Sequence, residues 1–185
     1  MDREEFWAIV EEAREVVGDT VSAESAEAVA QRVTARLVEL GPSAAVEFER
    51  VFDAVNGEAY RTDLWAAAYL MLGGCSDDGF DYFRGWLLAQ GRAVWEGAVA
   101  APDSLADLGL DPDDDEIQCE DFLSVASDAY SAATGDEEAF WTAVHDNGTR
   151  PESGTNDPAG EDFDFDDEDQ MRVRLPRLAA IYLDD

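Results

Sequence analysis

The sequence predicts an all-α protein: a single compact multi-helix domain with a central antiparallel helix pair and an acidic irregular segment near the C-terminus. Apolar residues recur at three- and four-residue spacing over most of the chain, which is typical of amphipathic helices. Gly and Pro separate these segments, and no convincing strand pattern is present. The 185 residues, 46% of them hydrophobic, suffice for one domain with a substantial core.

Three ordinary amphipathic helices are expected before residue 58. Asp2 and Glu5 form a capping-box pattern at the start of the first helix. Ser22 is placed to cap the second helix, which Gly41-Pro42 ends. The third helix begins there and ends at Asn56-Gly57.

The central helix pair is expected on either side of a glycine-rich turn. Either Thr62 or Asp63 can cap a helix over Leu64–Leu72, which is apolar nearly all round and therefore belongs in the middle of the domain. After the turn GGCSDDG, aromatic residues recur at helical spacing over Asp78–Gln90. These two segments form the predicted antiparallel pair.

Further helices are expected in the second half of the chain. Gly91 permits a bend before a helix that Pro102 closes. Two more helices are predicted over Cys119–Ala133 and Glu137–His145. Pro176 divides the apolar C-terminal stretch into two short pieces.

These elements suggest three parts of the chain. Residues 1–145 form the helical domain, and residues 146–170 form an acidic loop or linker whose order the sequence leaves open. Residues 171–185 regain apolar positions, which predicts a short C-terminal helix that packs back on the domain.

The charge balance is far from that of an average protein. Asp and Glu number 44 against 12 basic residues, all of them Arg, so the formal net charge is −32. Such a surface repels phosphate backbones and anionic lipid headgroups, so we expect neither direct nucleic-acid binding nor membrane binding. The same field attracts a basic protein surface. Codon bias or adaptation to salt is the alternative explanation of the acidity.

The cysteines and the apolar runs bear on location. Cys75 and Cys119 have no metal-like spacing, and no signal-peptide pattern precedes them, so we expect a cytoplasmic protein with two reduced structural thiols. The longest apolar run is shorter than the roughly 18–20 residues that a membrane span requires. No cofactor is expected.

One candidate ligand or structural cluster lies at the glycine-rich turn, and it consists of Asp77, Asp78, Asp81 and Arg84. Neighbouring carboxylates can act as acid and base if burial separates their pKa values. The preferred interpretation is that Ser76 or Asp77 caps the following helix and the other acids favour its positive N-terminal end. Arg84, among aromatic residues, can form an internal ion pair.

A second set of candidates consists of acids that would contact a partner: Asp113, Asp114, Asp115, Glu116, Asp164, Asp166 and Asp167. They belong to two dense acidic stretches, which are usually exposed because like charges repel one another. Neither stretch places Gly and Glu where a calcium-binding EF-hand loop needs them, so no metal site is predicted.

Catalytic signatures are missing from the sequence. His145, the single histidine, is expected at a helix end, where a cation is often only a cap. No nucleophile signature accompanies it, and Gly73-Gly74 lacks the context of a phosphate-binding loop, so no catalytic residue is assigned. Core packing is the default for the tryptophans, all of which fall on apolar helix faces: Trp7, Trp65, Trp86, Trp95 and Trp141.

The chain resembles a bacterial family called domain of unknown function 4240. The resemblance rests on the Phe6-Trp7 pair, the core LWAAAYLMLGGCSDDGFDYFRGWLLAQGR, the following PDSLA and the closing LPRL. It covers nearly the whole chain and is weakest over Asp146–Asp169. The resemblance implies no activity, cofactor or catalytic residue, and it leans toward binding rather than catalysis.

Two classes of function are therefore considered. The first is a non-enzymatic cytoplasmic interaction module whose acidic surface binds a basic protein partner, as an immunity-type inhibitor or a nucleic-acid mimic would. The alternative is an enzyme or small-ligand-binding protein with a cleft near the GGCSDDGF turn. A concave pocket at that turn would favour the alternative, whereas capping and a convex acidic face would favour the interaction module. The oligomeric state is not predicted.

Overall fold

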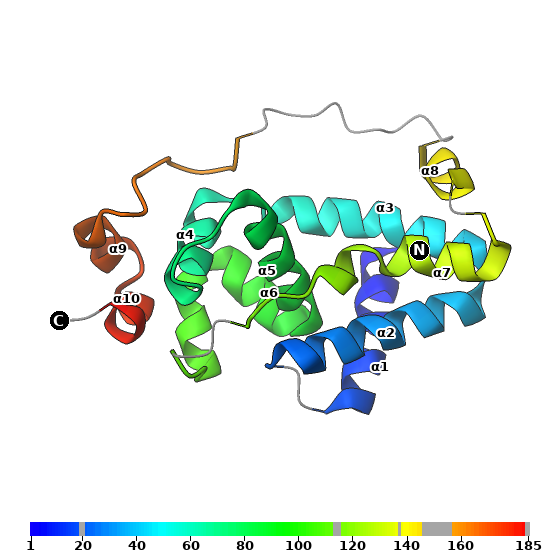
Figure 1. Ribbon diagram of the computed structural model, residues 1–185, viewed down its shortest axis with the longest axis horizontal. Coiled ribbons are helices and arrows are strands. Elements are labelled where there is room, and N and C mark those ends of the chain that lie inside the picture. The colour runs from blue at the N-terminus through cyan, green and yellow to red at the C-terminus, as the bar shows by residue number, and fades with distance from the viewer. Residues whose placement is uncertain (19–20, 113–115, 137, 146–156, 184–185) are drawn as a thin grey trace.

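The computed structural model describes residues 1–18, 21–112, 116–136, 138–145 and 157–183, and within these ranges the protein is all-α (Figure 1). This confirms the predicted fold class. The described helices are α1 Arg3–Val17, α2 Ala23–Leu40, α3 Pro42–Glu58, α4 Thr62–Met71, α5 Asp77–Ala89, α6 Arg92–Ala100, η1 Pro102–Leu108, η2 Glu120–Leu123, α7 Val125–Thr134, α8 Glu138–His145, α9 Glu168–Arg174 and α10 Pro176–Tyr182, where η denotes a 3-10 helix.

The first helices begin where the sequence predicts. Asp2 and Glu5 form a complete capping box at the start of α1, because each side chain accepts a hydrogen bond from the other residue's backbone N–H. Ser22 caps α2 by accepting from the N–H of Ser25 at 3.1 Å. Pro42 stands at the first position of α3, where its missing N–H costs no helical bond.

α4 and α5 contain the most continuous buried sequence. Most of α4 is buried, and α5 buries every residue from Phe83 to Ala89. The ring of Trp65 in α4 stacks on that of Phe80 in α5, with centroids 4.9 Å apart. The Trp65 indole N–H donates to the Cys75 carbonyl at 3.0 Å, which holds the turn between the two helices.

Two predicted helices differ from the structure by more than one residue. α4 begins two residues before the predicted Leu64, with Arg61 at the N-cap, because Asp63 uses its carboxylate to bind the Arg61 guanidinium and the Leu64 N–H. The helix expected over Cys119–Ala133 is divided into η2 and α7. Cys119 is extended, since its N–H donates to the Tyr82 carbonyl at 2.9 Å and is not available to a helix.

The C-terminal helices α9 and α10 lie at the opposite end of the molecule from α7 and α8 (Figure 1). Met171, Leu175 and Leu178 are buried, and α10 packs on η1 and α4. Asp103 of η1 caps α10 by accepting hydrogen bonds from the backbone N–H groups of Arg177 and Leu178 at 3.0 Å. Side-chain and backbone contacts therefore join the C-terminal helices to the middle of the sequence.

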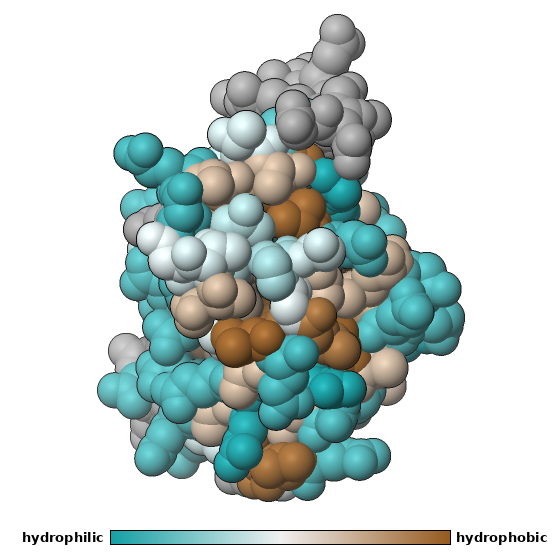
Figure 2. All heavy atoms as spheres, turned by 90° about the vertical axis from the view of Figure 1, so that its right-hand side faces the viewer, coloured by the Kyte–Doolittle hydropathy of each residue, from teal (hydrophilic) through white to brown (hydrophobic). Residues whose placement is uncertain are grey.

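Trp141 does not follow the prediction for the tryptophans. Its side chain in α8 is 49 % exposed, and it lies edge-on to Phe140 and stacked on His145. α8 buries Phe140 and Val144, so a short helix with two inward positions has no room for a third large side chain. Figure 2, which views this end of the molecule, shows small apolar areas interrupted by hydrophilic ones.

Candidate functional site

The N-terminus of α5 carries the acids of the predicted cluster. Ser76 is the N-cap, and its hydroxyl accepts from the Gly79 N–H at 3.1 Å. Asp77 and Asp78 are exposed in the first turn, where carboxylates interact favourably with the helix dipole. The geometry of this turn is therefore that of a capped helix start, as the preferred interpretation of the sequence holds.

Arg84 is a buried cation one turn beyond Asp81. It pairs with the Asp81 carboxylate and donates to the carbonyl of Asn56 in α3 at 3.0 Å. Its guanidinium carbon lies 5.1 Å from the ring centroids of both Tyr60 and Phe80. The internal ion pair indicated by the sequence is present, and it ties α5 to the end of α3.

The chain after the acidic stretch at 111–116 runs alongside α5. The Cys119 N–H binds the Tyr82 carbonyl, and a Cβ at Gly85 would lie 2.2 Å from the Cys119 carbonyl oxygen. Only a glycine at this position of α5 allows such a close backbone approach. Ile117, Cys119 and Phe122 are buried, and Glu120 is left on the surface beside α5.

This contact brings acids from two parts of the sequence around one phenol. The Tyr82 hydroxyl donates to Glu120 at 3.3 Å. The pKa of Tyr82 is raised, chiefly by the negative charge of Glu120, with smaller effects of desolvation, the hydrogen bond, Asp78 and Asp81. We refer to Asp78, Asp81, Tyr82 and Glu120 as the Tyr82 face. It joins acids of the turn cluster to Glu120, which follows the acidic stretch at 111–116 and is not among the predicted partner-binding acids.

The predicted partner-binding acids fall into three groups. Asp113, Asp114 and Asp115 lie outside the described residues, and Glu116 is exposed. The remaining three, Asp164, Asp166 and Asp167, lie on the segment that directly precedes α9. Asp164 accepts from the Asp166 N–H, Asp166 accepts from the Tyr69 hydroxyl, and Asp167 caps α9. These three acids therefore have contacts within the chain.

Intramolecular ion pairs occupy most of the positive charge. Arg50 is an exception, because its guanidinium donates hydrogen bonds to the backbone carbonyls of Ala143 and Val144 at the end of α8. Because acids outnumber arginines by 44 to 12, the surplus that remains is entirely negative. In the part of the chain that the structure describes, the following arginines pair with acids: Arg3, Arg14, Arg36, Arg61, Arg84, Arg92, Arg172, Arg174 and Arg177.

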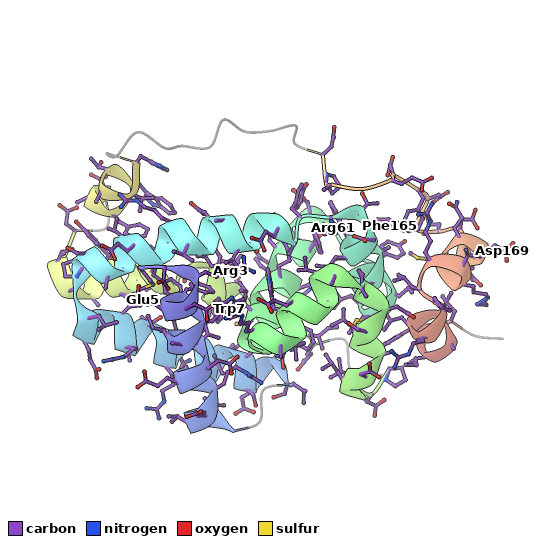
Figure 3. All side chains as sticks on the ribbon, turned by 180° about the vertical axis from the view of Figure 1, so that it is seen from behind. Arg3, Glu5, Trp7, Arg61, Phe165 and Asp169 are labelled. Atoms are coloured by element: carbon purple, nitrogen blue, oxygen red, sulfur yellow. The ribbon has the colours of Figure 1, made fainter. Side chains whose placement is uncertain are left out.

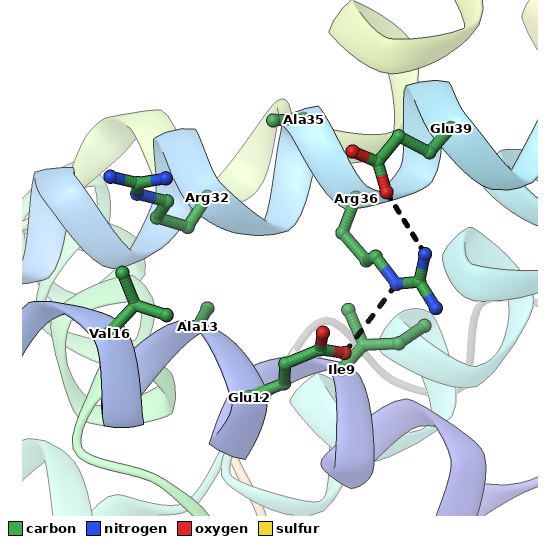
Figure 4. A pocket seen from close by; sticks show the side chains of 8 residues that line it. All are labelled: Ile9, Glu12, Ala13, Val16, Arg32, Ala35, Arg36 and Glu39. Carbon is green, nitrogen blue, oxygen red and sulfur yellow. Dashed lines mark hydrogen bonds and ion pairs between the residues drawn. The ribbon is translucent and has the colours of Figure 1, made fainter.

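Several shallow grooves lie away from the Tyr82 face. One of about 150 Å³ runs between α1 and α2, where Arg36 bridges Glu12 and Glu39 at the end near Ile9, and Val16 faces Arg32 at the other end (Figure 4). Another, of about 410 Å³, lies between α1 and α6 and is lined by Trp7 and Arg92 among others. The residues of the turn cluster line neither groove.

Glu49 of α3 is a buried acid that the sequence reasoning missed. Its side chain is almost fully buried, at 5 % exposed, and desolvation raises its pKa to about 8, with a further contribution from the charge of Asp53. Asp53 also has a raised pKa, through desolvation, which the charge of His145 partly opposes. The sequence did contain a sign of this burial, because Glu49 falls on the same helix face as the apolar residues Ala45, Phe48 and Phe52.

The two thiols are reduced and shielded. Cys119 is buried and Cys75 is half-buried, and they form no disulfide. Burial raises the pKa of Cys75 to about 11 and that of Cys119 to about 12. Thiols that stay protonated at neutral pH are poor nucleophiles, as expected of structural cysteines.

None of the described helices is long and apolar enough to span a membrane. Within the same residues, no group of three or more His, Cys, Asp or Glu side chains is arranged to hold a metal ion.

Comparisons with known proteins place the chain in a family. The chain has no significant match among curated proteins or solved structures. A family model described as "Protein of unknown function (DUF4240)" matches residues 1–132, which include α1 to η2, the turn cluster and the Tyr82 face. Since this match spans well over half of the 185 residues, the chain belongs to the DUF4240 family.

Proposed function

We propose that this protein is a non-enzymatic interaction module that binds a basic protein partner through its acidic surface, with the Tyr82 face as the centre of the contact. The observation that carries the proposal is the hydrogen bond from the Tyr82 hydroxyl of α5 to Glu120 of η2, with the charges of Asp78 and Asp81 also acting on the phenol. These acids come from α5 and from the 3-10 helix η2, and both elements are held in place by the buried contact at Gly85.

Such a face suits an arginine or lysine side chain. Carboxylates offer a cation charge-assisted hydrogen bonds, and a tyrosine ring offers its electron-rich face. Tyrosine is also among the residues that contribute most to binding at protein interfaces. Because the net charge of −32 acts over the whole approach, a basic partner would also associate faster at low salt.

Immunity-type inhibition and nucleic-acid mimicry remain specific versions of this proposal, and the cytoplasm is the proposed location. Both versions need a partner with a basic surface. In the first version the partner's basic surface is the active site of a toxin, and in the second it is a groove that binds nucleic acid.

The experiment compares two variants of equal charge in a capture assay. Asp78→Asn/Glu120→Gln neutralises two acids of the Tyr82 face, and Glu15→Gln/Glu24→Gln neutralises two exposed acids on α1 and α2. The immobilised full chain is incubated with lysate at about 0.05 M and about 0.5 M salt, since the higher concentration shortens the range of charge interactions.

We expect the wild type and the α1/α2 variant to retain the same basic protein at low salt and to lose it at high salt. The variant of the Tyr82 face should retain less of that protein at low salt. Retention that ignores salt would contradict electrostatic docking. Equal loss in both variants would mean that the charge acts evenly over the surface, as in an adaptation for solubility.

A further inference from the structure

A second surface, distinct from the Tyr82 face, lies along α4. Arg61, Trp65 and Tyr69 stand one helical turn apart and form its outward stripe, since most of the residues between them are buried. Tyr60 lies beside this stripe, with its ring centroid 6.1 Å from that of Trp65. We refer to Tyr60, Trp65 and Tyr69 as the aromatic face.

The chain's own residues 157–167 cover this face, and we call them the covering segment. At its start, the Ala159 N–H donates to the Tyr60 carbonyl and the Ala159 carbonyl accepts from the Thr62 N–H, both at 2.9 Å. Further along, Phe165 lies over Trp65 and Tyr69, with ring centroids 6.4 and 5.6 Å away. Figure 3 shows Arg61 of α4 and Phe165 of the covering segment near one another.

Side chains of the covering segment alternate in direction. Phe163 and Phe165 are half-buried and in edge-on contact with each other, whereas Asp162, Asp164 and Asp166 are exposed. Asp166 nevertheless reaches the Tyr69 hydroxyl, which donates to it. The aromatic face is thus contacted by backbone pairing, by an aromatic ring and by a carboxylate, the combination by which extended peptides are commonly recognised.

The covering segment has fewer buried contacts than the C-terminal helices. Met171, Leu175 and Leu178 bury α9 and α10, and Asp103 caps α10. The covering segment depends on half-buried rings, one backbone bridge and the Asp166–Tyr69 bond. It also makes two contacts with Arg174 of α9, an ion pair from the exposed Glu161 and a cation–π contact with the Phe163 ring. A segment with few buried contacts opens at a lower free energy than the elements around it. It can therefore leave the aromatic face, with loss of the two Arg174 contacts, while the buried residues Met171, Leu175 and Leu178 keep α9 and α10 in place.

The family model matches the aromatic face but does not reach the covering segment. The aromatic face lies within residues 1–132, which the family model matches, and the covering segment lies beyond them. From these observations we propose that the aromatic face is a binding site for extended segments of a partner protein that alternate aromatic and acidic residues, and that the covering segment occupies it as an intramolecular ligand.

The test uses the full chain and a labelled peptide with the sequence of residues 157–167. Phe163→Ala/Phe165→Ala removes the two rings of the covering segment and leaves the aromatic face intact. Ala159→Pro is a second way to release the segment, because proline lacks the N–H that binds Tyr60. Circular dichroism identifies folded variants, and fluorescence anisotropy measures binding of the peptide and of a control peptide with both Phe replaced by Ala.

The folded variants should bind the peptide at least about tenfold more tightly than the wild type, whose own segment competes at the high effective concentration of an intramolecular ligand. Adding Tyr69→Ala to the variants should abolish that gain, and the control peptide should not bind. Equal binding to variants and wild type, no binding to any folded variant, or binding that survives Tyr69→Ala would overturn the proposal.

Discussion

Glu49 is a carboxyl that the folded protein holds in its neutral form. Its folded-state pKa of about 8 lies above its ordinary value of 4.5, because desolvation disfavours the charged form. Between these pH values the folded chain binds more protons than the unfolded chain, so the free energy of unfolding falls as pH rises from about 4.5 to about 8. Below pH 4.5 the Glu49 carboxyl is neutral in both states and its titration does not lower the free energy of unfolding. Above about pH 8 the loss of stability no longer changes with pH.

Replacing Glu49 with Gln should remove this pH dependence. We expect Glu49→Gln to match the wild type near pH 4.5 and to be more stable at pH 8 by more than about 1.4 kcal/mol, the equivalent of a pKa difference of one. Thermal unfolding across this pH range measures the difference, with Glu15→Gln on the surface of α1 as the control. A gain of equal size at all pH values would show that Glu49 titrates normally.

Gly85 is the residue that allows the chain at Cys119 to approach α5. In Gly85→Ala the added Cβ would lie 2.2 Å from the Cys119 carbonyl oxygen, so the backbone must shift. Overpacking of this kind costs about 1–3 kcal/mol, or several degrees in Tm for a chain of this size. Differential scanning calorimetry measures the loss.

Gly97→Ala in α6 is the matched control for this substitution. There the nearest atom, the Ser104 hydroxyl, is 3.7 Å away, which is ordinary contact, and alanine favours a helix by up to about 1 kcal/mol. If both variants lost similar stability, the close approach at Gly85 would not be what holds the Tyr82 face.

Residues of the candidate site were predictable only in part. The sequence indicated the Ser76 cap and the Arg84 ion pair, because both depend on neighbours within one helical turn. The meeting of Tyr82 with Glu120 was not predictable, since it depends on a contact between residues far apart in the sequence. A glycine inside the apolar helix α5 was the one local sign of such an approach.

At the scale of the element, caps decided most boundaries, whereas a tertiary contact explains the main error. The helices α1 to α3 follow local capping and periodicity, so their predicted bounds are close to the observed ones. The helix predicted over Cys119–Ala133 is interrupted because a tertiary hydrogen bond holds Cys119 extended. Local periodicity cannot reveal a competing bond to a distant helix.

The docking of α10 provides a prediction about one element. Asp103→Ala removes the side chain that caps α10, and a lost cap costs about 1 kcal/mol. Asp107→Ala removes only the exposed ion pair with Arg177, which contributes little. Hydrogen exchange should therefore show faster exchange of α10 amides in the first variant and not in the second, whereas equal effects would contradict a capping role for Asp103.

At the scale of the whole molecule, the net charge of −32 opposes the compact state. Raising KCl from about 0.05 M to about 0.5 M shortens the screening length and should raise the unfolding midpoint. Calorimetry over this range measures the change. A midpoint that falls or stays constant would mean that the ion pairs among the described residues outweigh or balance the repulsion.

The central claim is that this acidic surface has a preferred place for a basic partner. The most direct measurement is an NMR titration of the isotope-labelled full chain with an arginine-rich peptide, followed residue by residue. The account predicts that the largest shifts occur at Asp78, Asp81, Tyr82 and Glu120 and that they diminish in Asp78→Asn/Glu120→Gln. Shifts spread over all exposed acids, or centred on another face and unaffected by that variant, would contradict it.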